Sequence, residues 1–198
     1  MRKVNLEEIE QLASESRDSL WEQAQELGRE PKGYLHWSAG HYGQFYDDYH
    51  INIDKDGSIY ISTDDFSEVL AHTYHRNTGA IGIALACCAF ATSEDLGDEP
   101  PTAKQIESMA QVVMVLANAL GIPLDKEHFM SHGRAADNED GIQASESYGP
   151  KTTCERWDLE YLGTEESPAF NPYDEEHRGD TIIVGKANWY NNQRKANG

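Results

Sequence analysis

Cations and cysteines are scarce in this 198-residue sequence. Its 16 lysines and arginines stand against 35 aspartates and glutamates, which gives a net charge of −19. Such a charge repels a phosphate backbone and an anionic bilayer alike, so nucleic acid is not an expected partner. Of the three cysteines, Cys87 and Cys88 are adjacent and Cys154 stands apart, unlike the even, spaced set of a disulfide framework. Cysteine is therefore expected to serve packing or metal binding.

Long apolar segments are also missing. No stretch approaches the roughly 20 apolar residues of a membrane-spanning helix, so membrane insertion is not expected. The opening MRKVNLEEIE is charged and lacks the apolar run of a signal peptide. We therefore expect a protein that is made in the cytoplasm without a signal peptide.

Hydrophobic periodicity predicts three helices. In residues 5–28, leucine and isoleucine recur at helical spacing. The second helix begins at a capping box of Thr102 and Gln105 and ends at Gly121. A shorter third helix is predicted from about Glu155 to Leu162.

Strand patterns fill much of the remaining chain. The run AIGIALACCAF (80–90) is nearly all apolar, which predicts a central strand covered on both faces. Residues 49–54 and 58–62 alternate around the turn KDG, which predicts a hairpin. Short strands are expected at Tyr34–Trp37 and His128–Ser131. Together with the helices, this order predicts an α/β or α+β fold, a central mixed β-sheet flanked by helices.

The chain divides into three predicted parts. Residues 1–30 form an N-terminal helical extension, residues 31–163 a catalytic domain, and residues 164–198 an acidic, largely irregular C-terminal extension. Within the last part, Thr181–Val184 could add one edge strand.

Three separated residues suggest a metal site. His36 ends one predicted strand, His132 ends another, and Cys154 lies in a loop before the third predicted helix. Imidazole nitrogen and thiolate are common zinc ligands, and three of them with a water form a catalytic zinc site. No compact CxxC pattern is present, so spacing alone leaves ordinary strand-end histidines as an alternative.

Four ordered segments resemble the type 2 N-acetylmuramoyl-L-alanine amidases, a family that includes phage lysins and peptidoglycan recognition proteins. The resemblance spans roughly Gly33 to Leu162. It is carried by YLHWSAG (34–40), DYHINIDKDGSIY (48–60), AHTYHRNTGAIGIAL (71–85), and SHGRA (131–135) with TCERWDL (153–159).

The resemblance implies a mixed sheet with flanking helices and a zinc ion held by His36, His132 and Cys154. In some relatives an aspartate replaces that cysteine, and the loop 133–153 is longer here than in short members, so Asp158 or Asp137 are alternative third ligands.

Further roles are also implied by the resemblance. Tyr49 corresponds to a tyrosine beside the metal and is a candidate catalytic residue. His72 corresponds to a substrate-binding histidine. The family often carries a lysine two residues before the third ligand; Lys151, three residues before Cys154, is the candidate for that oxyanion-stabilising role. Ala84 stands where several relatives have a catalytic glutamate.

The expected function is zinc-dependent hydrolysis of the amide between N-acetylmuramic acid and L-alanine in peptidoglycan. Without a signal peptide, such a protein suits a phage or prophage lysin that reaches the wall after release. The alternatives are a recognition module that binds peptidoglycan without cutting it, and a structural or tail-associated phage protein.

Overall fold

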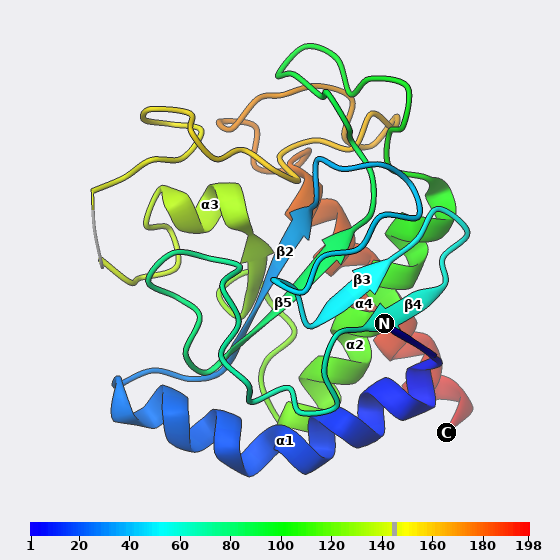
Figure 1. Cartoon of the computed structure of the whole chain (residues 1–198), viewed down its shortest axis with the longest axis vertical. Coiled ribbons are helices and arrows are strands. Elements are labelled where there is room, and N and C mark those ends of the chain that lie inside the picture. The colour runs from blue at the N-terminus through cyan, green and yellow to red at the C-terminus, as the bar shows by residue number, and fades with distance from the viewer. Residues whose placement is uncertain (144–145) are drawn as a thin grey trace.

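Six strands form one mixed sheet in the computed structural model, in the order β1–β4–β3–β5–β2–β6 (Figure 1). The structure describes residues 1–143 and 146–198. Strands β3, β5, β2 and β6 run parallel, whereas β4 is antiparallel to both of its neighbours. The predicted mixed sheet flanked by helices is confirmed. The strands are β1 (Arg2–Val4), β2 (Lys32–Trp37), β3 (Ile51–Ile53), β4 (Ile59–Ile61), β5 (Ala80–Leu85) and β6 (Phe129–Ser131).

The predicted hairpin is formed by β3 and β4. Ile51 pairs with Ile61 and Ile53 with Ile59, and the turn between the strands places Gly57 at φ 85°. This left-handed conformation is accessible to glycine without a steric penalty, which explains the KDG sequence. The hairpin prediction is confirmed.

The predicted central strand is β5, which lies between β3 and β2. All six of its residues are buried. The strand ends at Leu85, earlier than the apolar run, and beyond it an isolated bridge joins Cys88 to Gly40. Cys87 and Cys88 are both buried in the main core, which agrees with a packing role.

The two long predicted helices are present. α1 (Leu6–Glu26) begins at a capping box of Asn5 and Glu8, and α2 (Ala103–Leu120) begins at a capping box of Thr102 and Gln105. Reciprocal side-chain bonds of this kind satisfy backbone N–H groups that the first helical turn leaves unpaired. α1 packs against α2 near the end of the sheet where β2 and β5 begin (Figure 1).

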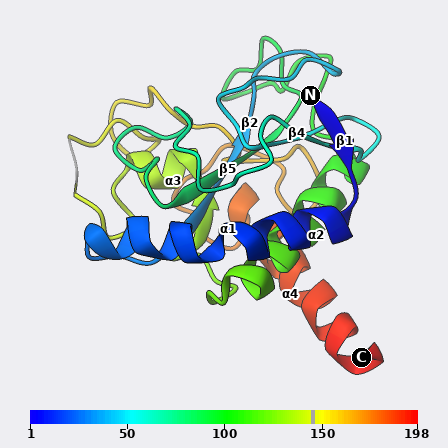
Figure 2. The same cartoon turned by 60° about the horizontal axis from the view of Figure 1, so that its bottom comes forward.

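Three predictions for the last third of the chain are wrong. Residues 155–162 form turns and no helix, and Thr181–Val184 are helical. The segment predicted to be largely irregular contains α4 (Gly179–Asn197), which packs against α2 and extends past it at its C-terminal end (Figure 2). Ile183, Val184 and Ala187 enter the main core. Burial of this stripe compensates for the weak helix propensity of a sequence rich in glycine and asparagine.

The two faces of the sheet differ. Along β2, Leu35 and Trp37 enter the main core with α2 and α4. Because successive strand residues point to opposite faces, Tyr34 and His36 lie on the other face. There Tyr34 packs with Ala135 of α3 (His132–Ala136). Within the described residues, no helix is both long and apolar enough to cross a bilayer.

Candidate metal centre

Two histidines meet where neighbouring parallel strands end. Leu35 of β2 pairs with Ser131 of β6, so the next residues lie side by side: His36 near the end of β2 and His132 directly after β6. Their ring centroids are 4.8 Å apart. His132 is also the first residue of α3, which Ser131 caps by accepting a hydrogen bond from the N–H of Arg134. The register of the sheet thus brings together residues that are far apart in sequence.

Asp158 completes this group. Its Oδ2 lies 2.9 Å from Nδ1 of His36, and its Oδ1 lies 3.4 Å from Nδ1 of His132. One ligand atom from each of the three residues lies within 4.8 Å of the other two. The segment that carries Asp158 is a turn, and Leu159 after it adopts φ 63°, a conformation rare for a branched side chain.

The electrostatics of the group favour neutral imidazole beside a carboxylate. Burial lowers the pKa of His132 to about 4, so its ring is uncharged at neutral pH. Burial alone would raise the pKa of Asp158, but its interactions with His132 and His36 hold the pKa below its ordinary value. Neutral imidazole and ionised carboxylate are the forms that bind metal.

The outer nitrogens of both rings have oxygen neighbours. Nε2 of His36 lies 3.3 Å from Oγ1 of Thr73, and Nε2 of His132 lies 3.5 Å from the hydroxyl of Tyr148. Such contacts orient an imidazole and fix which nitrogen carries the proton. Neither Thr73 nor Tyr148 was predicted from the sequence; Thr73 adjoins the predicted His72, but nothing in its own spacing marks it.

His72 and Tyr49 lie beside the group. The ring centroid of His72 is 5.8 Å from that of His36, and the centroid of Tyr49 is 4.9 Å from it. His72 packs directly on Gly82 of β5, where a Cβ atom would come within 2.5 Å of the imidazole. Burial raises the pKa of the Tyr49 phenol, so its hydroxyl stays protonated and can donate a hydrogen bond.

Cys154 is not a member of this group. Burial, together with the charges of Asp137 and Glu160, raises the pKa of its thiol, and the residues whose ligand atoms converge are His36, His132 and Asp158. Asp137 accepts hydrogen bonds from the Lys151 N–H and the Thr152 hydroxyl. Of the three residues considered as a third ligand, the structure brings only Asp158 to the histidines. Because residues 155–162 turn and do not form the expected helix, the carboxylate four positions after Cys154 reaches the site.

Lys151 is also placed elsewhere. Its ammonium donates to Glu139 at 3.0 Å, lies 3.5 Å from Glu175, and sits over the Tyr173 ring. The position two residues before Asp158 is occupied by Arg156, which lines the site. The sequence could have indicated Arg156, because the amidases that it resembles often have a lysine two residues before the third ligand.

Two cavities flank the group, with volumes of about 360 Å³ and about 640 Å³. Both are lined by His72, His132 and Arg156. Tyr49, Trp37 and Asp158 line the first, and Tyr74 and Tyr148 line the second. A substrate that extends to both sides of His132 would fit this arrangement.

The donor set suits a catalytic zinc ion. Ligand atoms of a tetrahedral zinc, each about 2.0–2.2 Å from the ion, lie roughly 3.3 Å from one another. The two contacts of the Asp158 carboxylate, 2.9 and 3.4 Å, are close to this spacing. A catalytic zinc ion takes three protein ligands and a water, so two imidazoles and one carboxylate would be enough to hold it.

Comparison with known proteins agrees with this chemistry. A family model described as N-acetylmuramoyl-L-alanine amidase matches residues 14–154, more than half of the chain. The chain belongs to this amidase family. It is accordingly an enzyme of the N-acetylmuramoyl-L-alanine amidase class.

Two solved amidase structures are similar to part of the chain. They are the endolysine N-acetylmuramoyl-L-alanine amidase LysCS and the N-acetylmuramoyl-L-alanine amidase LysC, both from Clostridium intestinale URNW. Each is 20% identical to this amidase with a TM-score of 0.38 over 63% of the chain, and the match covers 80% of LysCS and 82% of LysC. No curated protein sequence matches it.

The family match ends at Cys154, so Asp158 lies just beyond it. The candidate metal group therefore includes one residue outside the matched region.

Proposed function

We propose that this amidase uses a zinc ion held by His36, His132 and Asp158 to hydrolyse the amide between N-acetylmuramic acid and L-alanine of peptidoglycan. The supporting observation is the convergence of two Nδ1 atoms and one carboxylate beside a cavity. When bound there, zinc would supply a water of lowered pKa and a Lewis acid for the amide carbonyl.

Arg156 is proposed to stabilise the negative charge that develops on the carbonyl oxygen. It lines both cavities and precedes Asp158 by two residues, the spacing at which the family often has a lysine. The positive charge of Arg156 acts to lower the pKa of both Tyr49 and His132, which is consistent with this role. A cation beside the carbonyl oxygen would stabilise the negative charge that develops there in the transition state.

Tyr49 is proposed to donate a proton or hydrogen bond during the reaction. Its hydroxyl is protonated at neutral pH, and its ring lies against His36 at the wall of the first cavity. The departing alanine nitrogen needs such a donor. His72, which lines both cavities, is proposed to contact the substrate.

We also propose that the protein is a lysin, which acts on the cell wall after release. It rests on the motif resemblance to phage lysins. Peptidoglycan as the substrate rests on the family.

The deciding experiment combines zinc content with the release of new L-alanine amino termini from purified peptidoglycan. We expect about one zinc per chain, activity that a chelator removes and added zinc restores, and loss of both in His36→Ala. His177→Ala, which changes an exposed histidine paired with Asp174, is the matched control. Metal-free protein that binds peptidoglycan without releasing amino termini would instead identify a recognition module.

A further inference from the structure

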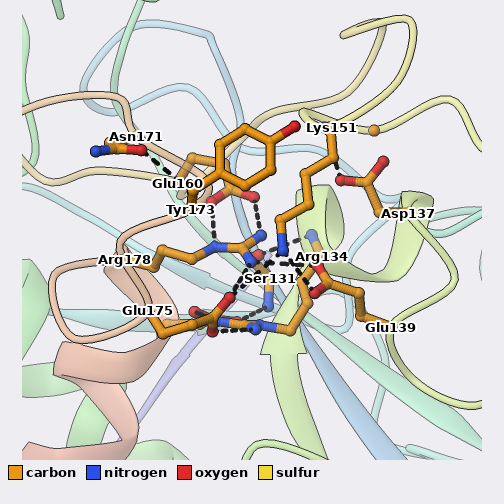
Figure 3. A network of polar contacts seen from close by, with 12 residues as sticks. Ser131, Arg134, Asp137, Glu139, Lys151, Glu160, Asn171, Tyr173, Glu175 and Arg178 are labelled. Carbon is orange, nitrogen blue, oxygen red and sulfur yellow. Dashed lines mark hydrogen bonds and ion pairs between the residues drawn. The ribbon is translucent and has the colours of Figure 1, made fainter.

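The start of α4 contacts both segments that carry the candidate ligands. Arg178 precedes this helix, and Gly179 and Asp180 are its first residues. All three are buried, and the side chains of Arg178 and Asp180 are fully so. Figure 3 shows Arg178 in the polar network that also contains Glu160, Glu175 and Arg134.

Asp180 forms hydrogen bonds to residues that precede and follow His132 in the sequence. Its Oδ2 accepts hydrogen bonds from the N–H of Ser131 at 3.0 Å and from Nε of Arg134 at 2.7 Å. Its Oδ1 accepts a third bond, from Nη2 of Arg134 at 3.0 Å. Ser131 precedes His132 and Arg134 follows it by two, so one carboxylate is bonded to residues on both sides of His132.

Arg178 and Gly179 fix the segment that carries Asp158. Nε and Nη2 of Arg178 donate to the two oxygens of Glu160, two residues after Asp158. The N–H of Gly179 donates to the Glu160 carbonyl at 3.1 Å. A Cβ at Gly179 would lie 2.1 Å from the Leu159 carbonyl oxygen, so only glycine allows this approach.

A strained backbone makes this support necessary. Leu159 has φ 63°, a left-handed conformation that a leucine keeps only when its surroundings hold it. The strained residue lies between Asp158 and the clamped Glu160. Without the contacts of Arg178 and Gly179, the turn would relax and the Asp158 carboxylate would move relative to the histidines.

We propose that Arg178, Gly179 and Asp180 are positioning residues that hold His132 and Asp158 at metal-binding distance. The inference rests on the proposed function. It assigns to a segment outside the family match a direct role in the geometry of the site. Buried ion pairs contribute little net stability, because desolvation offsets their attraction, but their bidentate geometry fixes orientation.

The test compares Asp180→Asn and Arg178→Lys with Arg194→Gln in the full chain. Asp180→Asn replaces an acceptor with an amide N–H that faces other donors, and Arg178→Lys keeps the charge but loses the two-pronged bond. Arg194, further along α4, forms an exposed ion pair with Glu10 of α1, which makes it the matched control. Zinc affinity is measured by competition with a chelating dye, and the Co²⁺-substituted proteins are compared by their visible spectra.

We expect zinc binding about 10- to 100-fold weaker in both variants, the size of effect usual for groups that orient metal ligands. The Co²⁺ spectrum should change in intensity, whereas Arg194→Gln should leave both readouts at their wild-type values. Folded variants with unchanged zinc affinity and Co²⁺ spectra would overturn the inference, even if their thermal stability fell.

Two further outcomes are decided by the same measurements. If Asp180→Asn does not fold, the zinc affinity and Co²⁺ spectrum of the milder variant Arg178→Lys are compared with those of the wild type. If the wild-type protein itself binds no zinc, the proposed function fails, a result distinct from a wild-type zinc site that the variants leave unaltered.

Discussion

The Asp158 carboxylate lies 2.9 Å from Nδ1 of His36, although 122 residues separate them in the sequence. His36 is fixed by a buried parallel strand, whereas Asp158 lies in a turn held by the start of α4. The ligand group thus combines a rigid sheet edge with a segment whose position depends on the C-terminal helix. Function and the packing of α4 are therefore expected to be coupled.

Asp158→Ala should remove bound zinc and reduce amide hydrolysis to the level of the metal-free protein, because two imidazoles alone do not complete the site. Cys154→Ser should keep both, since the converging ligand atoms belong to His36, His132 and Asp158. Zinc content by elemental analysis and the release of amino termini check this pair. Loss of zinc in Cys154→Ser with retention in Asp158→Ala would show that Cys154 is the ligand.

Tyr49→Phe should lower kcat by roughly 100-fold or more while zinc stays bound, because the substitution removes a proton donor and keeps the ring against His36. Steady-state kinetics on a soluble muropeptide measures the effect. Tyr60→Phe, which changes a tyrosine stacked on Phe45, is the control. An unchanged kcat in Tyr49→Phe would exclude the phenol from the chemistry.

Arg156→Gln should lower kcat by about 100- to 1000-fold, the cost of losing one oxyanion-stabilising group. Arg156→Lys should retain part of the rate, because the family's own residue at this spacing is often lysine. The ratio of the two rates is the measurement. If both variants raise only KM, Arg156 binds substrate without stabilising the transition state.

Glu175→Gln should flatten the acid limb of the stability profile. Burial raises the pKa of Glu175, but the hydrogen bond and charge of Arg134 and the charge of Arg178 outweigh it and lower the pKa to about 2. The unfolded chain then binds more protons than the folded one between about pH 4.5 and pH 2, so stability falls as pH falls through this window.

Urea unfolding at pH 3 and pH 7 checks this prediction. The difference in midpoint between the two pH values should be smaller in Glu175→Gln than in the wild type. Glu22→Gln, at an exposed position of α1, is the control and should keep the wild-type difference. If the midpoint difference of Glu175→Gln equals that of the wild type, the Glu175 carboxylate is not coupled to the two arginines.

Gly185→Ala should stabilise the fold by about 0.5–1 kcal/mol, because Gly185 lies inside α4 and a Cβ there meets no atom within 4 Å. Thermal unfolding should shift upward by roughly 1–4 °C. Gly121→Ala should have the opposite sign, since Gly121 adopts φ 67° and its Cβ would approach Arg17. Destabilisation by Gly185→Ala would mean that α4 is not helical there.

Local patterns predicted most of the fold correctly. The capping boxes of α1 and α2, the KDG hairpin and the apolar run of β5 all follow from interactions among residues close in sequence. Such interactions favour one conformation before any tertiary contact forms. α4 escaped prediction because its helix propensity is weak and its stability comes from packing on α2.

The sequence by itself determined the mixed sheet, both long helices and the strand-end positions of His36 and His132, because periodicity and capping encode them locally. Which third residue joins the two histidines was decided only by the tertiary structure. The three residues between Cys154 and Asp158 are not helical, and Arg178 and Gly179, remote in sequence, bind Glu160 just after Asp158. Packing between segments far apart in the sequence produces no hydrophobic periodicity in the segment that it positions.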